Sequence, residues 1–185
     1  MKKLLLLLLL AFLFTHSMYG QTFKLSPTGY VNADGSGKKY VVLEFSEKNQ
    51  KELYDAVKSF IVTSYNSPKD VMSEAPPTNI SITGVSDFTY RMMGCEVKYK
   101  VNFTFKDNRI KVDFLIVDLS PSQLGATWTI SLVGGASIMD DHGIFKKNGE
   151  VRSKKAKERL EDIANDLISQ LKNNINAPSE LEEDW

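Results

Sequence analysis

The residues that most resemble a reactive group lie together in one short stretch. Asp140, Asp141 and His142 follow one another and precede a glycine, an order in which an imidazole and two carboxylates could form the corner of a metal site. Structural and catalytic metals need three or four converging ligands. The chain has only one other histidine, His16, and it lies in the N-terminal stretch. The pattern therefore predicts a solvated turn, with no metal ligands assigned.

Two other patterns fall short of a catalytic or cofactor motif. No G-x-S-x-G sequence is present to expose a nucleophilic serine. Residues 35–38 (GSGK) resemble part of a phosphate-binding loop, but they lack the full G-x-x-x-x-G-K-[ST] spacing and precede an apolar, strand-like stretch rather than a helix. The sequence consequently assigns no catalytic residue, no cofactor and no metal. A hydrolase that uses carboxylates or His142 stays open as the alternative function.

The remaining candidate is a surface. Lys98, Lys100 and Lys111 recur at alternate positions of two apolar–polar stretches, and Leu115 and Val117 continue the second alternation. Because alternate residues of a strand share a face, all of these side chains are expected on one open face. Lysines on such a face keep a protein soluble, and they also attract anions. We therefore predict a candidate binding surface there, for an unidentified envelope protein or a small anionic ligand.

Those lysines belong to a predicted β-hairpin. Residues 95–105 and 110–116 alternate apolar with polar side chains, and Asp107-Asn108 supplies a two-residue loop. The predicted pairs are Phe105 with Ile110, Phe103 with Val112, Val101 with Phe114, and Tyr99 with Ile116. A slip of one residue would place Phe103 opposite Lys111, so the pattern favours one register.

The same alternation extends to the end of the second strand. It places Leu119 on the open face with Leu115 and Val117, so an otherwise polar face ends in apolar residues. Either residues 137–149 or residues 21–38 cover this row, or it contacts a partner. A subunit of a larger assembly is a third hypothesis that such an exposed row raises.

The other elements can be placed by periodicity. Strands are predicted at residues 40–45, 79–83 and 128–132. Ser46 is expected to cap a helix that ends at residues 66–68, and a final helix should begin near Val151 and end before Pro178. Both helices carry one apolar stripe, and one face of the sheet is the simplest surface that buries two stripes. The fold class is therefore α+β, an antiparallel sheet of about five strands with two helices packed on one face.

The N-terminus has the pattern of an export signal. Lys2 and Lys3 precede an unbroken apolar run, residues 4–14, which is shorter than the ~20 residues that span a bilayer. We expect cleavage after Gly20, contact with the membrane only before cleavage, and a periplasmic or secreted product. A permanent membrane anchor is the disfavoured alternative. The expected divisions are a signal peptide (1–20), an extended segment (21–38), one α+β domain (39–176) and an acidic tail (177–185).

Composition excludes several classes of protein. The chain has 185 residues, with 23 Lys and Arg against 23 Asp and Glu, whereas nucleic-acid-binding proteins have a basic excess. Cys95 is the only cysteine, so no internal disulfide can form, and it is expected to be a small buried residue. The last helix begins among Arg152, Lys154, Lys155, Lys157 and Arg159. Positive charge opposes the helix dipole there, and the acidic tail or an external anion could offset it.

The order of elements resembles a bacterial family of exported domains of unknown function with a TATA-box-binding-protein-like fold. The resemblance rests on a strand before Ser46, on residues 51–54 (KELY) and on the turn at residues 105–109 (FKDNR), and it covers roughly residues 29–131. Asn108 stands where the family pattern has a glycine. The resemblance implies a curved antiparallel sheet backed by helices, and it implies no chemistry or DNA binding, because function resides in sites rather than folds. The predicted function is an exported, non-catalytic binding or interaction module.

Overall fold

The structure is a computed structural model that describes residues 22–123, 128–135 and 142–177. Its elements are, in order, β1 (Phe23–Ser26), β2 (Gly29–Asn32), β3 (Tyr40–Glu44), α2 (Gln50–Ser64), α3 (Pro68–Val71), β4 (Met72–Ala75), β5 (Asn79–Tyr90), β6 (Met93–Lys106), β7 (Arg109–Pro121), β8 (Ser131–Val133), β9 (Gly143–Phe145) and α4 (Lys154–Asn176). The predicted signal peptide, its cleavage site and nearly all of the acidic tail lie outside the described residues.

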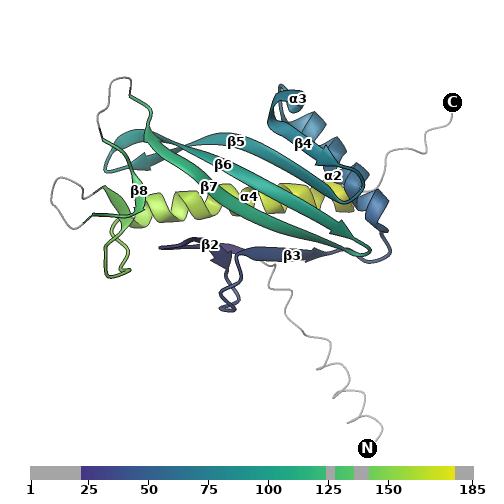
Figure 1. Ribbon diagram of the computed structural model, residues 1–185, viewed down its shortest axis with the longest axis horizontal. Helices are drawn as coiled ribbons and strands as arrows, with labels where there is room; N and C mark the ends of the chain where they lie inside the picture. The colour runs from purple at the N-terminus through teal and green to yellow at the C-terminus, as the bar shows by residue number, and fades with distance from the viewer. Residues whose placement is uncertain (1–21, 124–127, 136–141, 178–185) are drawn as a thin grey trace, which may run out of the picture.

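A five-stranded antiparallel sheet forms the body of the protein. Its strand order is β3-β7-β6-β5-β4, and α2 and α4 lie behind it in the view of Figure 1 while the front face carries no helix. Burial follows the same division, since alternate residues of β6 are buried and the residues between them are exposed or half-buried. The predicted fold class is confirmed: α+β, with the two long helices on one face.

The hairpin of β6 and β7 has the predicted register. Phe105 pairs with Ile110, Phe103 with Val112, Val101 with Phe114, and Tyr99 with Ile116. At the turn, Asn108 takes a positive φ of 62°, a conformation that asparagine tolerates better than most residues. The Asp107 carboxylate accepts a hydrogen bond of 2.9 Å from the backbone N–H of Gln50, which attaches the hairpin tip to the first turn of α2.

Helix α2 begins three residues later than the sequence indicated. The N-cap is Asn49 and not Ser46: the Asn49 side chain accepts from the backbone N–H of Glu52, and the Glu52 carboxylate accepts from the Asn49 N–H. This reciprocal pair satisfies two of the free N–H groups of the first turn. Glu47, which would be the first helical residue if Ser46 were the cap, has a positive φ of 62° in the loop before the helix.

Strand β5 is longer than predicted, and β4 was not predicted. β5 continues from Asn79 to Tyr90, well beyond the expected end at Thr83. Before it, the short helix α3 and strand β4 occupy residues 68–75, for which no element was predicted, and β4 pairs only with residues 79–82 of β5. The Pro76-Pro77 peptide bond that joins β4 to β5 is cis.

The strand predicted at residues 128–132 is replaced by a smaller element. β8 starts at Ser131 and pairs in parallel with β9, outside the main sheet. The alternation of Trp128, Ile130 and Leu132 indicated an extended chain but could not show which strand it pairs with. Trp128 and Leu132 still pack against the core, and Ile130 is buried.

The segment at residues 21–38 contains a hairpin that completes the core. Phe23, Leu25 and Tyr30 of β1 and β2 are buried. The rings of Phe23 and Tyr30 lie 6.0 and 4.9 Å from that of Phe114. Backbone N–H groups of Phe23 and Leu25 donate to side chains of α4, and the Tyr30 hydroxyl donates to the Leu160 carbonyl. The hairpin therefore connects the edge of β7 to α4.

Helix α4 runs along the back of the sheet. It starts at Lys154 rather than near Val151, and the whole predicted stripe is buried: Ala156, Leu160, Ile163, Ala164, Leu167, Leu171 and Ile175. Pairs spaced four residues apart, Lys154–Glu158 and Lys157–Glu161, place acidic groups beside its basic first turn. Among the helices of the described residues, none is long and apolar enough to cross a membrane.

Candidate functional site

The predicted binding surface lies on the open face of the sheet. Leu115 and Val117 are 46% and 57% exposed, and Lys98 and Lys100 are exposed beside them on β6. Val85 of β5, which the sequence analysis did not include, is 58% exposed and pairs with Lys98. Three aliphatic side chains and two lysines therefore share the middle of this face, across three neighbouring strands.

Lys111 differs from the other two lysines. Its ammonium group lies 3.0 Å from the Asp113 carboxylate and 5.2 Å from the centre of the Tyr40 ring. The ion pair and the cation–π contact each hold the ammonium group of Lys111 in place. This group is therefore less available to a ligand. Lys98 and Lys100 form no ion pair with any residue that the structure describes. Both ammonium groups therefore remain accessible to a ligand in the middle of this face.

Leu119 does not belong to this surface, and the prediction that placed it there is wrong. The pairing of β6 with β7 shifts between Lys98 and Tyr99, so that Lys98 opposes Asp118 and Val97 opposes Leu119. One extra residue, Val117, is inserted in β7 at this bulge. An inserted residue reverses the faces of everything that follows it. Leu119 consequently points to the helix side and is only 4% exposed.

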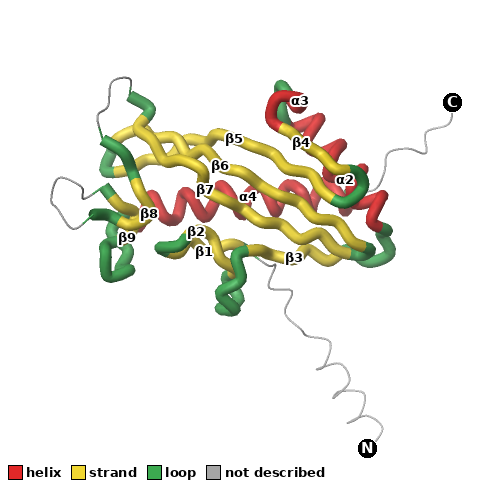
Figure 2. Tube along the Cα trace, in the orientation of Figure 1, coloured by secondary structure: helices red, strands yellow, loops and turns green. Residues whose placement is uncertain are grey.

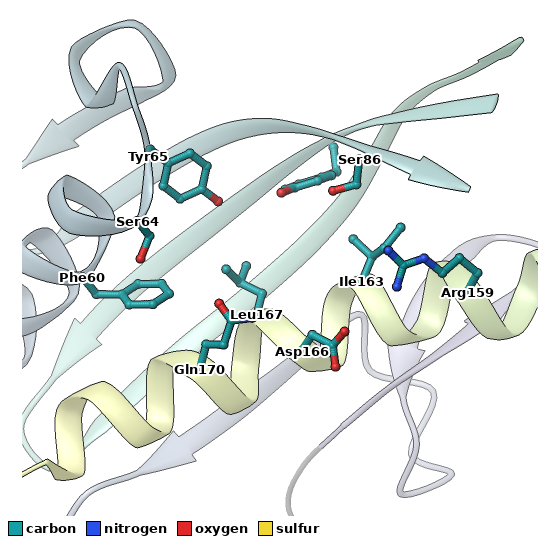
Figure 3. Close-up of a pocket in the computed structure, with 10 residues that line it drawn as sticks. Phe60, Ser64, Tyr65, Ser86, Arg159, Ile163, Asp166, Leu167 and Gln170 are labelled. Atoms are coloured by element: carbon teal, nitrogen blue, oxygen red, sulfur yellow. The ribbon is translucent and has the colours of Figure 1, made fainter. Parts of the chain in front are cut away.

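A cavity on the helix side of the sheet was not expected from the sequence. It has a volume of about 270 Å³ and lies between β5, α4 and the end of α2. Figure 3 shows Phe60, Ile163 and Leu167 close to its floor, with the Tyr65 hydroxyl and Ser86 above them. Polar side chains of α4, among them Arg159 and Asp166, form its exposed rim.

Two small residues interrupt the large apolar side chains of β5 beside this cavity. The helix-facing positions of β5 read Ile80, Ile82, Gly84, Ser86, Phe88 and Tyr90. A Cβ atom at Gly84 would lie 2.4 Å from the ring of Tyr99. The ring therefore occupies the space that a side chain at position 84 would need. Ser86, next on the same face, is too short to reach the helices and is half-buried. Two small residues inside an apolar alternation were the sequence signal for this cavity.

Burial modifies the chemistry of the Tyr65 hydroxyl beside the cavity. Burial first, and then the neighbouring Tyr99, raises the pKa of Tyr65 above its ordinary value. Tyr65 therefore stays protonated across the physiological pH range and can act as a hydrogen-bond donor to a ligand.

A second hollow of about 550 Å³ lies next to the first one. It is bordered by residues 87–89 of β5 and by Lys155 and Arg159 of α4. Arg159 lines both hollows. Neither Lys155 nor Arg159 forms an ion pair within the described part of the chain, so their charges are available to an anionic group.

His142 does not form a catalytic or metal site with the residues that can be described. Its ring is half-buried against Trp128, with the ring centres 5.0 Å apart, and its Nδ1 atom is buried without a hydrogen-bond partner. Asp140 and Asp141 lie outside the described residues. Across residues 22–123, 128–135 and 142–177, no group of three or more His, Cys, Asp or Glu side chains could hold a metal ion.

Cys95 is a buried core residue, as predicted. Its side chain is 0% exposed on the helix side of β6, and burial raises the pKa of its thiol. A thiol with a raised pKa is mostly protonated at neutral pH and reacts slowly. Cys95 therefore contributes to packing.

Comparison with known proteins finds similarity only to solved structures. No family model matches the chain, and no curated protein matches it. A TBP-like protein from Parabacteroides distasonis is similar with a TM-score of 0.49 and 14% identity, over 72% of this chain and 91% of that one. A DUF4468 family protein from Bacteroides ovatus has the same TM-score and identity, over 76% of this chain and 86% of that one. Both descriptions agree with the resemblance found in the sequence.

Proposed function

We propose that this protein is an exported, non-catalytic binding module of the bacterial cell envelope, and that it contacts a partner protein through the open face of its sheet. The observation that carries the proposal is the group formed by Val85, Leu115 and Val117, exposed in the middle of a sheet face that no helix covers. Exposed aliphatic residues that gather on one open face are typical of an interaction surface, and here the two lysines of β6 lie between Val85 and the β7 residues.

The charges of this face define the kind of partner. Lys98 and Lys100 lie beside the aliphatic group and form no ion pair among the described residues, whereas Lys111 is occupied by Asp113. A complementary surface would bury apolar side chains and place carboxylates opposite the two free lysines. The partner is therefore expected to be a protein with an apolar patch edged by acidic residues.

Export is supported by the sequence of the N-terminus. Two lysines, an apolar run of signal-peptide length and a small residue before Gln21 form the pattern that secretion machinery recognises. Cell fractionation and intact-mass measurement of the full chain test this part. The expected product begins at Gln21 and is found outside the cytoplasm. A product that keeps Met1 in the cytoplasm or remains a membrane anchor contradicts it.

The contact surface can be tested by photo-cross-linking in intact cells. A photoreactive residue at Leu115 should give a discrete adduct with a single acidic partner. The same residue at Val62, which is 50% exposed on α2, is the matched control and should give none. Equal adducts at both positions, or none at Leu115, contradict the proposal.

Charge reversal gives a second, independent test with the partner identified by cross-linking. Lys98→Glu with Lys100→Glu should weaken binding about tenfold or more, because like charges would then oppose each other. Lys24→Glu changes an exposed lysine of β1, away from the open face, and should leave the affinity unchanged. Thermal unfolding of each variant shows whether the fold is intact.

A further inference from the structure

Strand β5 has one edge that is only partly paired. On that side β4 pairs with residues 79–82, and α3 follows at the next positions. From Val85 to Tyr90 no described strand pairs with this edge, and Figures 1 and 2 show β4 at one end of the sheet only. Alternate residues of such an edge direct backbone N–H and C=O groups outward, which is the pairing surface that an extended peptide needs.

Strand β4 shows within the protein what this edge accepts. It is a short extended segment whose Met72 and Glu74 point to the helix side, because they pair with the buried Ile82 and Ile80. The Glu74 carboxylate accepts from the Tyr54 hydroxyl and from the Lys58 ammonium group of α2. Backbone pairing with β5 is thus combined with an apolar contact and a carboxylate held by a cation on the helix behind.

The same three components are present along the free part of the edge, with no segment occupying them. The cavity beside Ser86 offers an apolar floor, and the adjoining hollow beside Phe88 is bordered by Lys155 and Arg159. Ser86 and Phe88 are two positions apart on one face of β5, a spacing of about 7 Å along a strand. Consecutive helix-side residues of an added strand would reach one hollow each.

We propose that the free edge of β5 binds an extended peptide, antiparallel to β5 as β4 is, which places a carboxylate side chain at Arg159 and, two residues later, an apolar side chain in the cavity of Phe60, Ile163 and Leu167. The antiparallel direction sets this order, because the peptide passes Phe88 before Ser86. The site is separate from the open face and does not depend on the proposed partner there.

Asp166 limits which peptides fit. It lies on the rim of the apolar cavity, seven residues and about 10 Å along α4 from Arg159. A second carboxylate in place of the apolar side chain would therefore meet a like charge. The acidic residue is confined to the Arg159 end of the site.

The test uses the purified protein and a capped heptapeptide, Ser-Thr-Glu-Thr-Leu-Thr-Ser. Amide chemical shifts should respond with a dissociation constant below about 1 mM, the affinity of a weak but specific site. Hydrogen exchange should slow at the outward amides of residues 85–90. No response at about 1 mM peptide overturns the proposal.

Three matched peptides separate backbone pairing from side-chain contact. N-methylation of alternate residues on the pairing edge should abolish binding, because it removes the hydrogen bonds of the added strand. Exchanging the Glu and Leu positions, or replacing Glu by Gln, should weaken binding about threefold to tenfold, as expected for one exposed charge contact. Unchanged affinity with the N-methylated peptide, or shifts confined to the open face, would show that no strand is added.

A protein variant tests the role of the cation. Arg159→Ala should weaken the Glu peptide about threefold to tenfold and leave the Gln peptide almost unchanged. Lys147→Ala removes an exposed cation from the turn after β9 and serves as the control. Equal effects of Arg159→Ala on both peptides contradict the proposed contact. If the Arg159→Ala variant does not fold, binding of the matched peptides to the unaltered protein still tests the proposal.

Discussion

The shift in pairing between Lys98 and Tyr99 divides the long hairpin into two parts with different properties. On the turn side, the helix-facing residues of β6 and β7 are large, apolar and buried, as Phe103 and Val112 illustrate. Beyond the shift, Leu119 changes face, Ser86 interrupts the apolar row of β5, and the two hollows lie behind the sheet. Uniform packing stabilises the first part, whereas its interruption in the second part creates surfaces that a ligand can use.

This contrast follows from packing density. A close-packed core leaves no room for a ligand, because its side chains already interdigitate. A glycine and a serine at helix-facing positions leave space that the neighbouring residues fill only in part. The exposed Val85 and Val117 lie in the same part of the sheet, so both of its faces depart from the simple alternation there.

The largest effect is expected in the uniformly packed part. Phe103→Ala should lower the free energy of unfolding by about 3–5 kcal/mol, because it leaves a cavity in a fully buried site. Urea unfolding followed by circular dichroism measures the loss. Phe103→Leu keeps most of the volume and should cost far less. A loss below about 1 kcal/mol for the alanine variant would mean that this part is not the rigid core of the protein.

A paired substitution beyond the shift tests the reversal of faces. Leu119→Ala should cost about 2–4 kcal/mol because Leu119 is buried, and Val117→Ala should change stability by less than about 0.5 kcal/mol. The same urea experiment measures both. If Val117→Ala is the more damaging of the two, the residue inserted at the bulge has been assigned wrongly.

The accuracy of the sequence analysis differs between the same two parts. Alternation predicted the pairs from Phe105–Ile110 to Tyr99–Ile116 because nothing interrupts them. It failed at Leu119, because Leu115, Ile116 and Val117 form an unbroken apolar run that does not show where a residue is inserted. The open-face positions of Lys98, Lys100, Leu115 and Val117 all precede or adjoin the bulge, and they were predicted correctly.

The cavity was missed for a related reason. The strand was expected to end at Thr83, although it continues through Gly84 to Ser86, which lines the cavity. The cap of α2 was also misplaced, because Ser46 and Asn49 both have side chains suited to that role. Only Asn49 has a glutamate three residues later that completes the reciprocal pair. This capping box is a local signal that is present in the sequence itself.

An intermediate effect should follow from filling the space beside Tyr99. Gly84→Ala is expected to cost about 1–3 kcal/mol, because the added Cβ would overlap the Tyr99 ring. In the double variant with Tyr99→Leu the added cost should be about 1 kcal/mol smaller, since the shorter side chain leaves room. Unfolding free energies of the four proteins in this cycle give the coupling. Strictly additive losses would show that the ring does not lie over Gly84.

The smallest effect concerns the attachment of β4, which distinguishes the covered end of β5 from its free end. The Tyr54 hydroxyl, and then Lys58, hold the pKa of Glu74 below its ordinary value. A carboxyl group whose pKa is lowered on folding stabilises the protein above its unfolded pKa of about 4.3, and that contribution disappears as the pH falls through the folded pKa. Glu74→Gln should therefore cost about 0.5 kcal/mol at neutral pH, the typical size for an exposed contact, and progressively less at acid pH.

Urea titrations of both proteins from neutral to acid pH measure this difference. A difference that stays constant over the whole range would mean that these contacts do not hold β4 on the sheet, and that both ends of β5 are equally open to a peptide.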